Sequence, residues 1–172
     1  MEDGIVKPSA EYRAPSTESQ HYMDEAFREA FAGFRNNHGG PFGAVIVKDG
    51  KIIGSGCNMV VSLNDPTAHA EIVAIRQACK NINSYDLTGS VIYSTCEPCP
   101  MCFSAIYWAN IKEVIFSLSR YDAEMMGFKD NHIYNEISMG HEERGIRFTK
   151  TDHPSVKELI REWNRKTDKF HY

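Results

Sequence analysis

The sequence lacks the features of membrane, secreted and polyanion-binding proteins. No apolar run approaches the ~20 residues that a membrane-spanning helix needs. The first twenty residues, MEDGIVKPSAEYRAPSTESQ, are polar and contain no signal-peptide core. Positive charge is not in excess either, because the formal net charge is −4 and residues of both signs are interspersed. We therefore expect a cytoplasmic protein that binds neither a membrane nor a nucleic acid.

Proline and cysteine are also sparse. With 7 prolines and 42% hydrophobic residues, the 172-residue chain is typical of one folded domain rather than a disordered or fibrous protein. Its five cysteines are an odd number without an export signal, so a disulfide framework is not expected. Residues 1–18 show no apolar periodicity and are predicted to form a flexible tail before a domain at 19–172.

The apolar pattern alternates between strands and helices. Apolar residues at three-and-four spacing predict a helix, two β-branched runs joined by Asp49-Gly50 predict a hairpin, and further strands and helices alternate after it. Such alternation requires crossover connections, which favour an α/β fold of three layers, with helices on both faces of a mixed sheet. The predicted helices are 19–36, 64–80, 98–110 and 155–167, with short helical pieces at 122–128 and 131–138. The predicted strands are 42–48, 51–59, 90–95, 113–119 and, at an edge, 146–151.

Three cysteines in the stretch STCEPCPMC raise the possibility of a metal site. Cys99 and Cys102 are three residues apart at a predicted helix start, so they share one helix face, and His69 lies at another helix start. Cysteine sulfur and histidine nitrogen are the ligands that zinc prefers. With Cys96 as a fourth ligand the site would be closed and structural; without it, a position stays open for water. Glu71 favours the open site, because a carboxylate beside such a water is suited to proton transfer.

The two halves of this pattern form a known signature. His-x-Glu followed by Pro-Cys-x-x-Cys is typical of zinc deaminases, and here it reads HAE at 69–71 and PCPMC at 98–102. With GGPFGAVIVKDG at 39–50, NDPTAHAEIVAIRQACK at 64–80 and CEPCPMCFSAIYWA at 96–109, the chain resembles the cytidine deaminase superfamily, and more narrowly the small zinc-dependent guanine deaminases of the bacterial type. The resemblance implies a mixed five-stranded sheet and a homodimer whose C-terminal segments are exchanged between protomers.

The resemblance also implies roles for single residues. His69, Cys99 and Cys102 resemble the ligands of one zinc ion per subunit, and Glu71 resembles the proton shuttle. The implied substrate contacts are Phe42 as a ring that stacks on a purine, Asn58 as an amide that reads the base edge, Trp108 as a pocket wall, and Tyr172 as a contact from the partner chain.

A second acidic residue is expected beyond these motifs, to engage the leaving amine or a ring nitrogen. Asp130 is the first candidate and Asp122 the second; Lys129 stands where the family pattern leads us to expect another acid. Either aspartate could instead be a solvated surface residue, and Phe42 and Trp108 could simply fill the core.

The activity implied by the resemblance is hydrolytic deamination of guanine to xanthine and ammonia, which belongs to purine metabolism. The alternatives are a nucleoside deaminase acting on guanosine or cytidine, a tRNA adenosine deaminase, and a zinc-stabilised module without catalysis. A basic surface would favour the tRNA enzyme, and the net charge of −4 speaks against it.

Overall fold

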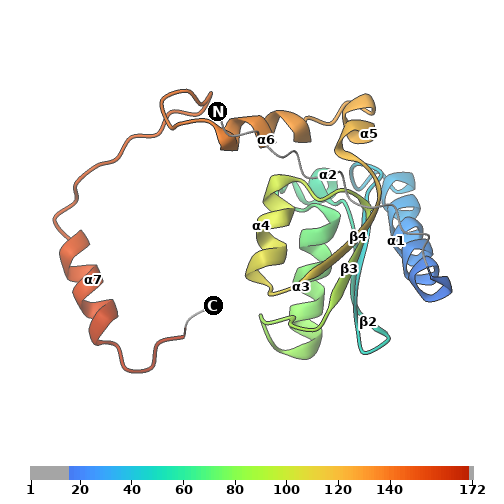
Figure 1. Ribbon diagram of the computed structural model, residues 1–172, viewed down its shortest axis with the longest axis horizontal. Coiled ribbons are helices and arrows are strands. Elements are labelled where there is room, and N and C mark those ends of the chain that lie inside the picture. The colour runs from blue at the N-terminus through green and yellow to red at the C-terminus, as the bar shows by residue number, and fades with distance from the viewer. Residues whose placement is uncertain (1–15, 171–172) are drawn as a thin grey trace, which may run out of the picture.

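The computed structural model describes residues 16–170 and contains one sheet covered by helices on both faces (Figure 1). The sheet has the strand order β2-β1-β3-β4. β1 pairs antiparallel with both β2 and β3, whereas β3 and β4 are parallel, so the sheet is mixed. The strands are β1 (Gly43–Lys48), β2 (Lys51–Cys57), β3 (Val91–Cys96) and β4 (Glu113–Leu118).

The hairpin prediction is confirmed at the turn between β1 and β2. Asp49 and Gly50 both have positive φ, at 50° and 70°. Two consecutive residues of this kind match the right-handed twist of the flanking strands, which is why Asp-Gly is favoured there. The turn therefore sets the register in which Lys48 lies opposite Lys51.

The three-layer prediction is confirmed by the way β1 is buried. Ala44 and Ile46 pack on one face with α3 (Ala70–Ile82), whereas Val45 packs on the other face with Ala26 of α1 (Thr17–Arg35). Because both faces are covered, β1 is an almost continuous apolar run rather than an alternating one. Figure 1 shows α1 on one side of the sheet and α3 with α4 (Pro100–Trp108) on the other.

Helix α1 begins two residues earlier than predicted. The Ser16 hydroxyl accepts a hydrogen bond from the backbone N–H of Ser19 at 3.1 Å, and this cap starts the helix at Thr17. The rest of the predicted tail, residues 1–15, lies outside the described residues.

The prediction of five strands is wrong for the described residues, which form a four-stranded sheet. The expected edge strand at 146–151 has no regular structure, and Ile146 and Phe148 are exposed. Within residues 16–170, β4 pairs only with β3, so this segment adds no strand to the other edge of β4. Among residues 16–170, no helix combines the length and apolar character needed to cross a membrane. The remaining helices are α2 (Val60–Leu63), α5 (Arg120–Met125), α6 (Asp130–Ser138) and α7 (Val156–Arg165).

Candidate metal centre and pocket

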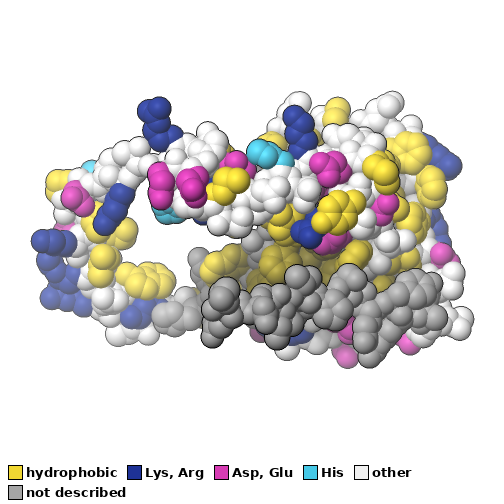
Figure 2. Space-filling view, turned by 45° about the horizontal axis from the view of Figure 1, so that its top comes forward, with side chains coloured by type: hydrophobic (Ala, Val, Ile, Leu, Met, Phe, Trp, Pro, Cys, Tyr) yellow, Lys and Arg dark blue, Asp and Glu magenta, His cyan; other side chains and the backbone are white. Residues whose placement is uncertain are grey.

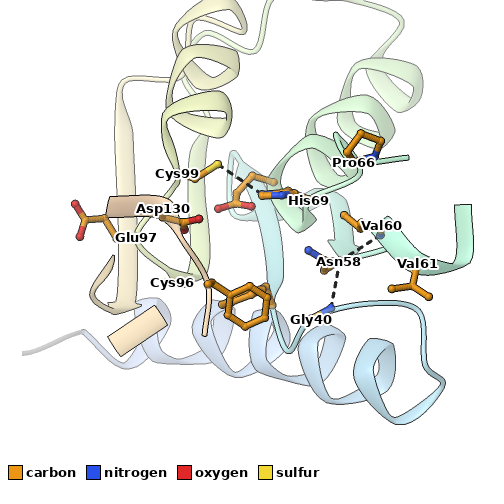
Figure 3. A pocket seen from close by; sticks show the side chains of 13 residues that line it. Gly40, Asn58, Val60, Val61, Pro66, His69, Cys96, Glu97, Cys99 and Asp130 are labelled. Atoms are coloured by element: carbon orange, nitrogen blue, oxygen red, sulfur yellow. Dashed lines mark hydrogen bonds between the residues drawn. The ribbon is translucent and has the colours of Figure 1, made fainter. Parts of the chain in front are cut away.

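Two helix starts bring together the three predicted metal ligands. His69 is the residue immediately before α3, and Cys99 is the residue immediately before α4, with Cys102 in the first turn of that helix. Their potential ligand atoms all lie within 4.8 Å of one another. The Nδ1 atom of His69 is 3.5 Å from the Sγ atom of Cys99 (Figure 3).

Local sequence explains why His69 stands at the helix start. Helix α3 was predicted to begin near residue 64, but it begins at Ala70. The carboxylate of Asp65 accepts hydrogen bonds from the backbone N–H and the hydroxyl of Thr67, at 2.8 and 2.6 Å, and so forms a separate turn. His69 therefore keeps an extended backbone, with ψ 157°, and faces the start of α4.

The donor set fits a zinc ion. Zinc lies ~2.3 Å from sulfur and ~2.1 Å from nitrogen in tetrahedral sites, which separates neighbouring ligand atoms by roughly 3.5 Å. The pKa of Cys99 is lowered to about 4 by a hydrogen bond with Cys102, and further by its contact with His69. The same hydrogen bond raises the pKa of Cys102, so Cys99 carries the negative charge of the pair, and the thiolate is the form that binds a metal.

Cys96 does not join this group among the described residues. Its buried thiol donates instead to the backbone carbonyl of Ser119, with Sγ 3.7 Å from the oxygen. Burial raises the pKa of Cys96 to about 12, which keeps it a neutral thiol. The group that could hold a metal ion therefore comprises His69, Cys99 and Cys102, without Cys96.

Glu71 lies beside these ligands in the first turn of α3. Its side chain is buried, and it accepts hydrogen bonds from the Ser94 hydroxyl at 3.2 Å and from the Cys102 thiol at 3.4 Å. Burial raises the pKa of Glu71, because desolvation disfavours the carboxylate. A buried carboxyl group whose pKa is raised, placed beside the metal-binding group, is suited to proton transfer.

A pocket of about 280 Å³ opens beside these groups. This volume lies just below the ~300–1,000 Å³ that is typical of ligand pockets. Its walls come from the β1 and β2 ends, the starts of α3 and α4, and the α5–α6 connection (Figure 3). The lining residues are Gly40, Phe42, Asn58, Val60, Val61, Pro66, His69, Glu71, Cys96, Glu97, Cys99, Phe128 and Asp130.

Asn58 presents a fixed amide to this pocket. Its Oδ1 atom accepts hydrogen bonds from the backbone N–H groups of Gly40 and Val60, at 3.3 and 3.2 Å. These bonds orient the side chain and leave its amide nitrogen as the donor for a ligand. The approach needs Gly39, because a Cβ atom there would lie 2.1 Å from Oδ1 of Asn58.

Phe42 contributes an aromatic wall, and sequence reasoning missed its neighbour. The rings of Phe42 and Phe128 meet edge to face, with centroids 4.7 Å apart. Phe128 also lines the pocket, although it lies 86 residues further along the chain. No pattern in the sequence marks this contact, because the connection between α5 and α6 has no apolar repeat that would place it.

The two candidate acidic residues, Asp130 and Asp122, have different environments in the structure. Asp130 is the first residue of α6 and lines the pocket, and burial raises its pKa. Asp122 instead accepts hydrogen bonds from the backbone N–H and the hydroxyl of Ser119, at 2.8 and 2.7 Å, which lower its pKa. These are the bonds of a helix cap. As a pocket residue, Asp122 is therefore a wrong prediction.

The structure does not place Trp108 at this pocket. Trp108 ends α4, about 9 Å along the helix axis from Cys102, since each residue adds ~1.5 Å. Its side chain is 63% exposed and lines a separate apolar depression together with Ile75 and Cys79. Within one chain the prediction of a pocket wall is thus corrected. Tyr172 lies outside the described residues.

Glu97 is a second pocket residue that the sequence reasoning missed. It stands between Cys96 and Cys99 in the motif itself, so its position was the available signal. Its carboxylate accepts a hydrogen bond from the backbone N–H of Arg120 at 3.0 Å. In Figure 3 this carboxylate points away from His69.

A mixed α/β sheet with a His/Cys/Cys group and a buried glutamate defines a zinc-dependent deaminase. Residues 16–118 match the family model described as the cytidine and deoxycytidylate deaminase zinc-binding region, and the chain belongs to this family. It is accordingly a hydrolase that removes amino groups.

Within this family, the chain is similar to both guanine deaminases and tRNA-specific adenosine deaminases. The guanine deaminase of Bacillus subtilis is 47% identical over 150 residues, which cover 86% of this chain and 96% of that protein. A crystal structure of guanine deaminase from Bacillus subtilis superposes with a TM-score of 0.85 at 44% identity, covering 89% of this chain and 98% of the other. A tRNA-specific adenosine deaminase of Haemophilus influenzae is 44% identical over 102 residues, which cover 59% of this chain and 58% of that enzyme.

Proposed function

We propose that this protein deaminates guanine hydrolytically to xanthine and ammonia. The observation that carries the proposal is the buried Glu71, which lies beside the His69, Cys99 and Cys102 group at the base of a small pocket. The similarity to a guanine deaminase over 96% of that enzyme's length supports guanine as the substrate.

The residues present divide the chemistry between them. His69, Cys99 and Cys102 would hold one zinc ion per subunit, which supplies a hydroxide nucleophile at neutral pH by lowering the pKa of water to about 7. Glu71 takes one proton from the attacking water and delivers it to a ring nitrogen; it then takes the second proton from the hydroxyl added at C2 and delivers it to the amino group, which leaves as ammonia. Its burial keeps the carboxyl group able to hold that proton.

Guanine offers groups that match the pocket walls. The free amide nitrogen of Asn58 can donate to O6 or N7, the two acceptors on one edge of guanine. The carboxylate of Asp130 can accept from a ring N–H or from the amino group. Phe42 offers an aromatic surface for the purine. Donation to O6 would favour guanine over adenine, which carries an amino group at that position instead of an oxygen.

A substrate panel tests this function. The protein should release ammonia from guanine, and at least about 100-fold less efficiently from guanosine, adenine, cytosine, cytidine and tRNA. A pocket of about 280 Å³ leaves little room for a ribose, and other bases leave Asn58 or Asp130 unpaired. Turnover of tRNA in preference to guanine would favour the second candidate function, for which the similarity to a tRNA-specific adenosine deaminase is the observation.

Asp130 and Asp122 provide a further test. Asp130→Asn should lower kcat/KM for guanine by about 100-fold, because the variant loses a charged acceptor in the pocket. Asp122→Asn is the matched control: it should keep activity within about twofold and lower the melting temperature by weakening the α5 cap. Ammonia release and thermal unfolding measure both effects. A larger kinetic loss in the Asp122 variant would contradict the assignment.

We also propose that the protein is a homodimer in which C-terminal segments are exchanged. Helix α7 lies away from the sheet, at the end of an extended connection (Figure 1). It presents an apolar stripe next to basic side chains (Figure 2). Exposed stripes of this spacing are usually covered by another surface. The stripe residues, each at least 46% exposed, are Val156, Leu159, Ile160 and Trp163.

Deleting residues 171–172 tests whether the terminus of one protomer limits the pocket of the other. If Tyr172 closes over the base, its loss should reduce kcat/KM for guanine by about tenfold and raise the guanosine-to-guanine ratio, because an aromatic contact and a steric barrier disappear together. Deletion of residues 1–10, outside the family resemblance, is the control. Sedimentation measures the dimer in each variant. An unchanged ratio would count against the proposed role of Tyr172.

A further inference from the structure

We propose that Tyr134 is a positioning residue, which holds Asp130 beside the metal centre with the help of Arg120 and Glu97. The inference rests on the proposed function, since Asp130 is there assigned to the substrate. It starts from the weak attachment of α6, the helix that carries Asp130. No residue of α6 is buried, so apolar packing alone does not fix the helix against the sheet.

Tyr134 attaches α6 to the segment that carries the metal ligands. It lies four residues after Asp130, which puts both side chains on one side of the helix. Its hydroxyl donates a hydrogen bond of 2.8 Å to the backbone carbonyl of Pro98. Pro98 immediately precedes Cys99. The position of Asp130 is therefore tied to the backbone that holds a metal ligand.

Arg120 and Glu97 fix the ring of Tyr134 from a second direction. The guanidinium carbon of Arg120 lies 4.8 Å from the centroid of the Tyr134 ring. Arg120 is itself bound to Glu97, through its backbone N–H at 3.0 Å and through Nε at 4.0 Å from the carboxylate. Among residues 16–170 the buried Nε atom has no hydrogen-bond partner, so the Glu97 carboxylate and the rings of Tyr134 and Tyr121 stabilise this cation.

The network explains why Glu97 faces away from His69. Its carboxylate binds Arg120 and not the metal-binding group. The neighbouring Pro98 carbonyl binds Tyr134, so two consecutive residues hold the pair that anchors α6. Loss of the Tyr134 hydroxyl should leave the three metal ligands in place and shift only Asp130. Small displacements of a substrate-binding group are costly, since ~1 Å can reduce a rate by about 100-fold.

The test is a double-mutant cycle with Tyr134→Phe and Asp130→Asn. Tyr134→Phe should keep its zinc and lower kcat/KM for guanine by about tenfold. In the Asp130→Asn background the same change should have less than about a twofold effect, because the residue it positions has lost its function. Tyr121→Phe is the matched control, since that ring also contacts Arg120 while its hydroxyl makes no hydrogen bond among residues 16–170.

A second measurement does not depend on the substrate. Hydrogen exchange of the α6 amides should be faster in Tyr134→Phe than in the wild type or in Tyr121→Phe. Unchanged exchange would overturn the anchoring role, and a full kinetic loss in the Asp130→Asn background would overturn the positioning role. If the wild type releases no ammonia from guanine, the proposed function is wrong, but the positioning role can still be tested. The mutant cycle is then measured with whichever compound of the substrate panel is deaminated. If none is deaminated, hydrogen exchange alone tests the anchoring of α6.

Discussion

Replacing Glu71 by glutamine is expected to leave zinc bound and to abolish nearly all deamination. Glutamine has almost the same shape and can still accept a hydrogen bond from Ser94 at Oε1, so the pocket should persist. It cannot take up and return a proton, and positioned proton transfer contributes typically ~10²–10⁴ in rate. We therefore expect guanine turnover to fall by at least about 100-fold.

Metal analysis and ammonia release on the same preparation measure this effect. Glu113→Gln, on the exposed edge of β4, removes the same charge far from the pocket and should behave as the wild type. A Glu71→Gln variant that retains zinc and substantial activity would exclude Glu71 as the proton shuttle.

The second large effect concerns the cysteines, which are not equivalent. His69→Ala and Cys99→Ala should each lose zinc, because only two protein ligands remain; we expect affinity to fall by more than about 100-fold, since even outer partners of metal ligands contribute 10- to 100-fold. Cys96→Ser should keep near-equimolar zinc and activity. Its thiol is neutral and donates to the Ser119 carbonyl, and a serine hydroxyl can also donate there.

Zinc content after dialysis, together with a melting curve, separates metal loss from unfolding. A Cys96→Ser protein that folds but contains no zinc would overturn the choice of ligands. Retention of zinc by Cys99→Ala would also contradict the choice of ligands, because it would show that Cys99 is not needed to bind the metal.

The hairpin and the layers could be predicted because they depend on local sequence. Asp49 and Gly50 tolerate positive φ, and the continuous apolar run around Val45 and Ile46 requires burial on two faces. The helix starts were less accurate. Ser16 and Asp65 each form hydrogen bonds that move a helix boundary, and apolar spacing does not report such bonds.

Several residues of the pocket could not be predicted from the sequence. Asp122 and Asp130 are eight positions apart and look alike in the sequence, yet one caps a helix and the other lines the pocket. Trp108 lies in the same motif as Cys102, but it is at the opposite end of α4, where its side chain is exposed. Phe128 and Glu97 line the pocket because segments that are distant in the sequence lie together in the fold, which the sequence patterns did not predict.

By itself, the sequence determined which residues are candidate metal ligands, because residue type and spacing along two helix starts are local properties. His69, Glu71, Cys99 and Cys102 each stand within a few residues of a helix start that their neighbours favour. Only the tertiary structure decided which further side chains face that centre. Asn58 follows β2, whereas Phe128 and Asp130 stand where α6 begins, and their convergence depends on how helices pack against a shared sheet rather than on any spacing along the chain.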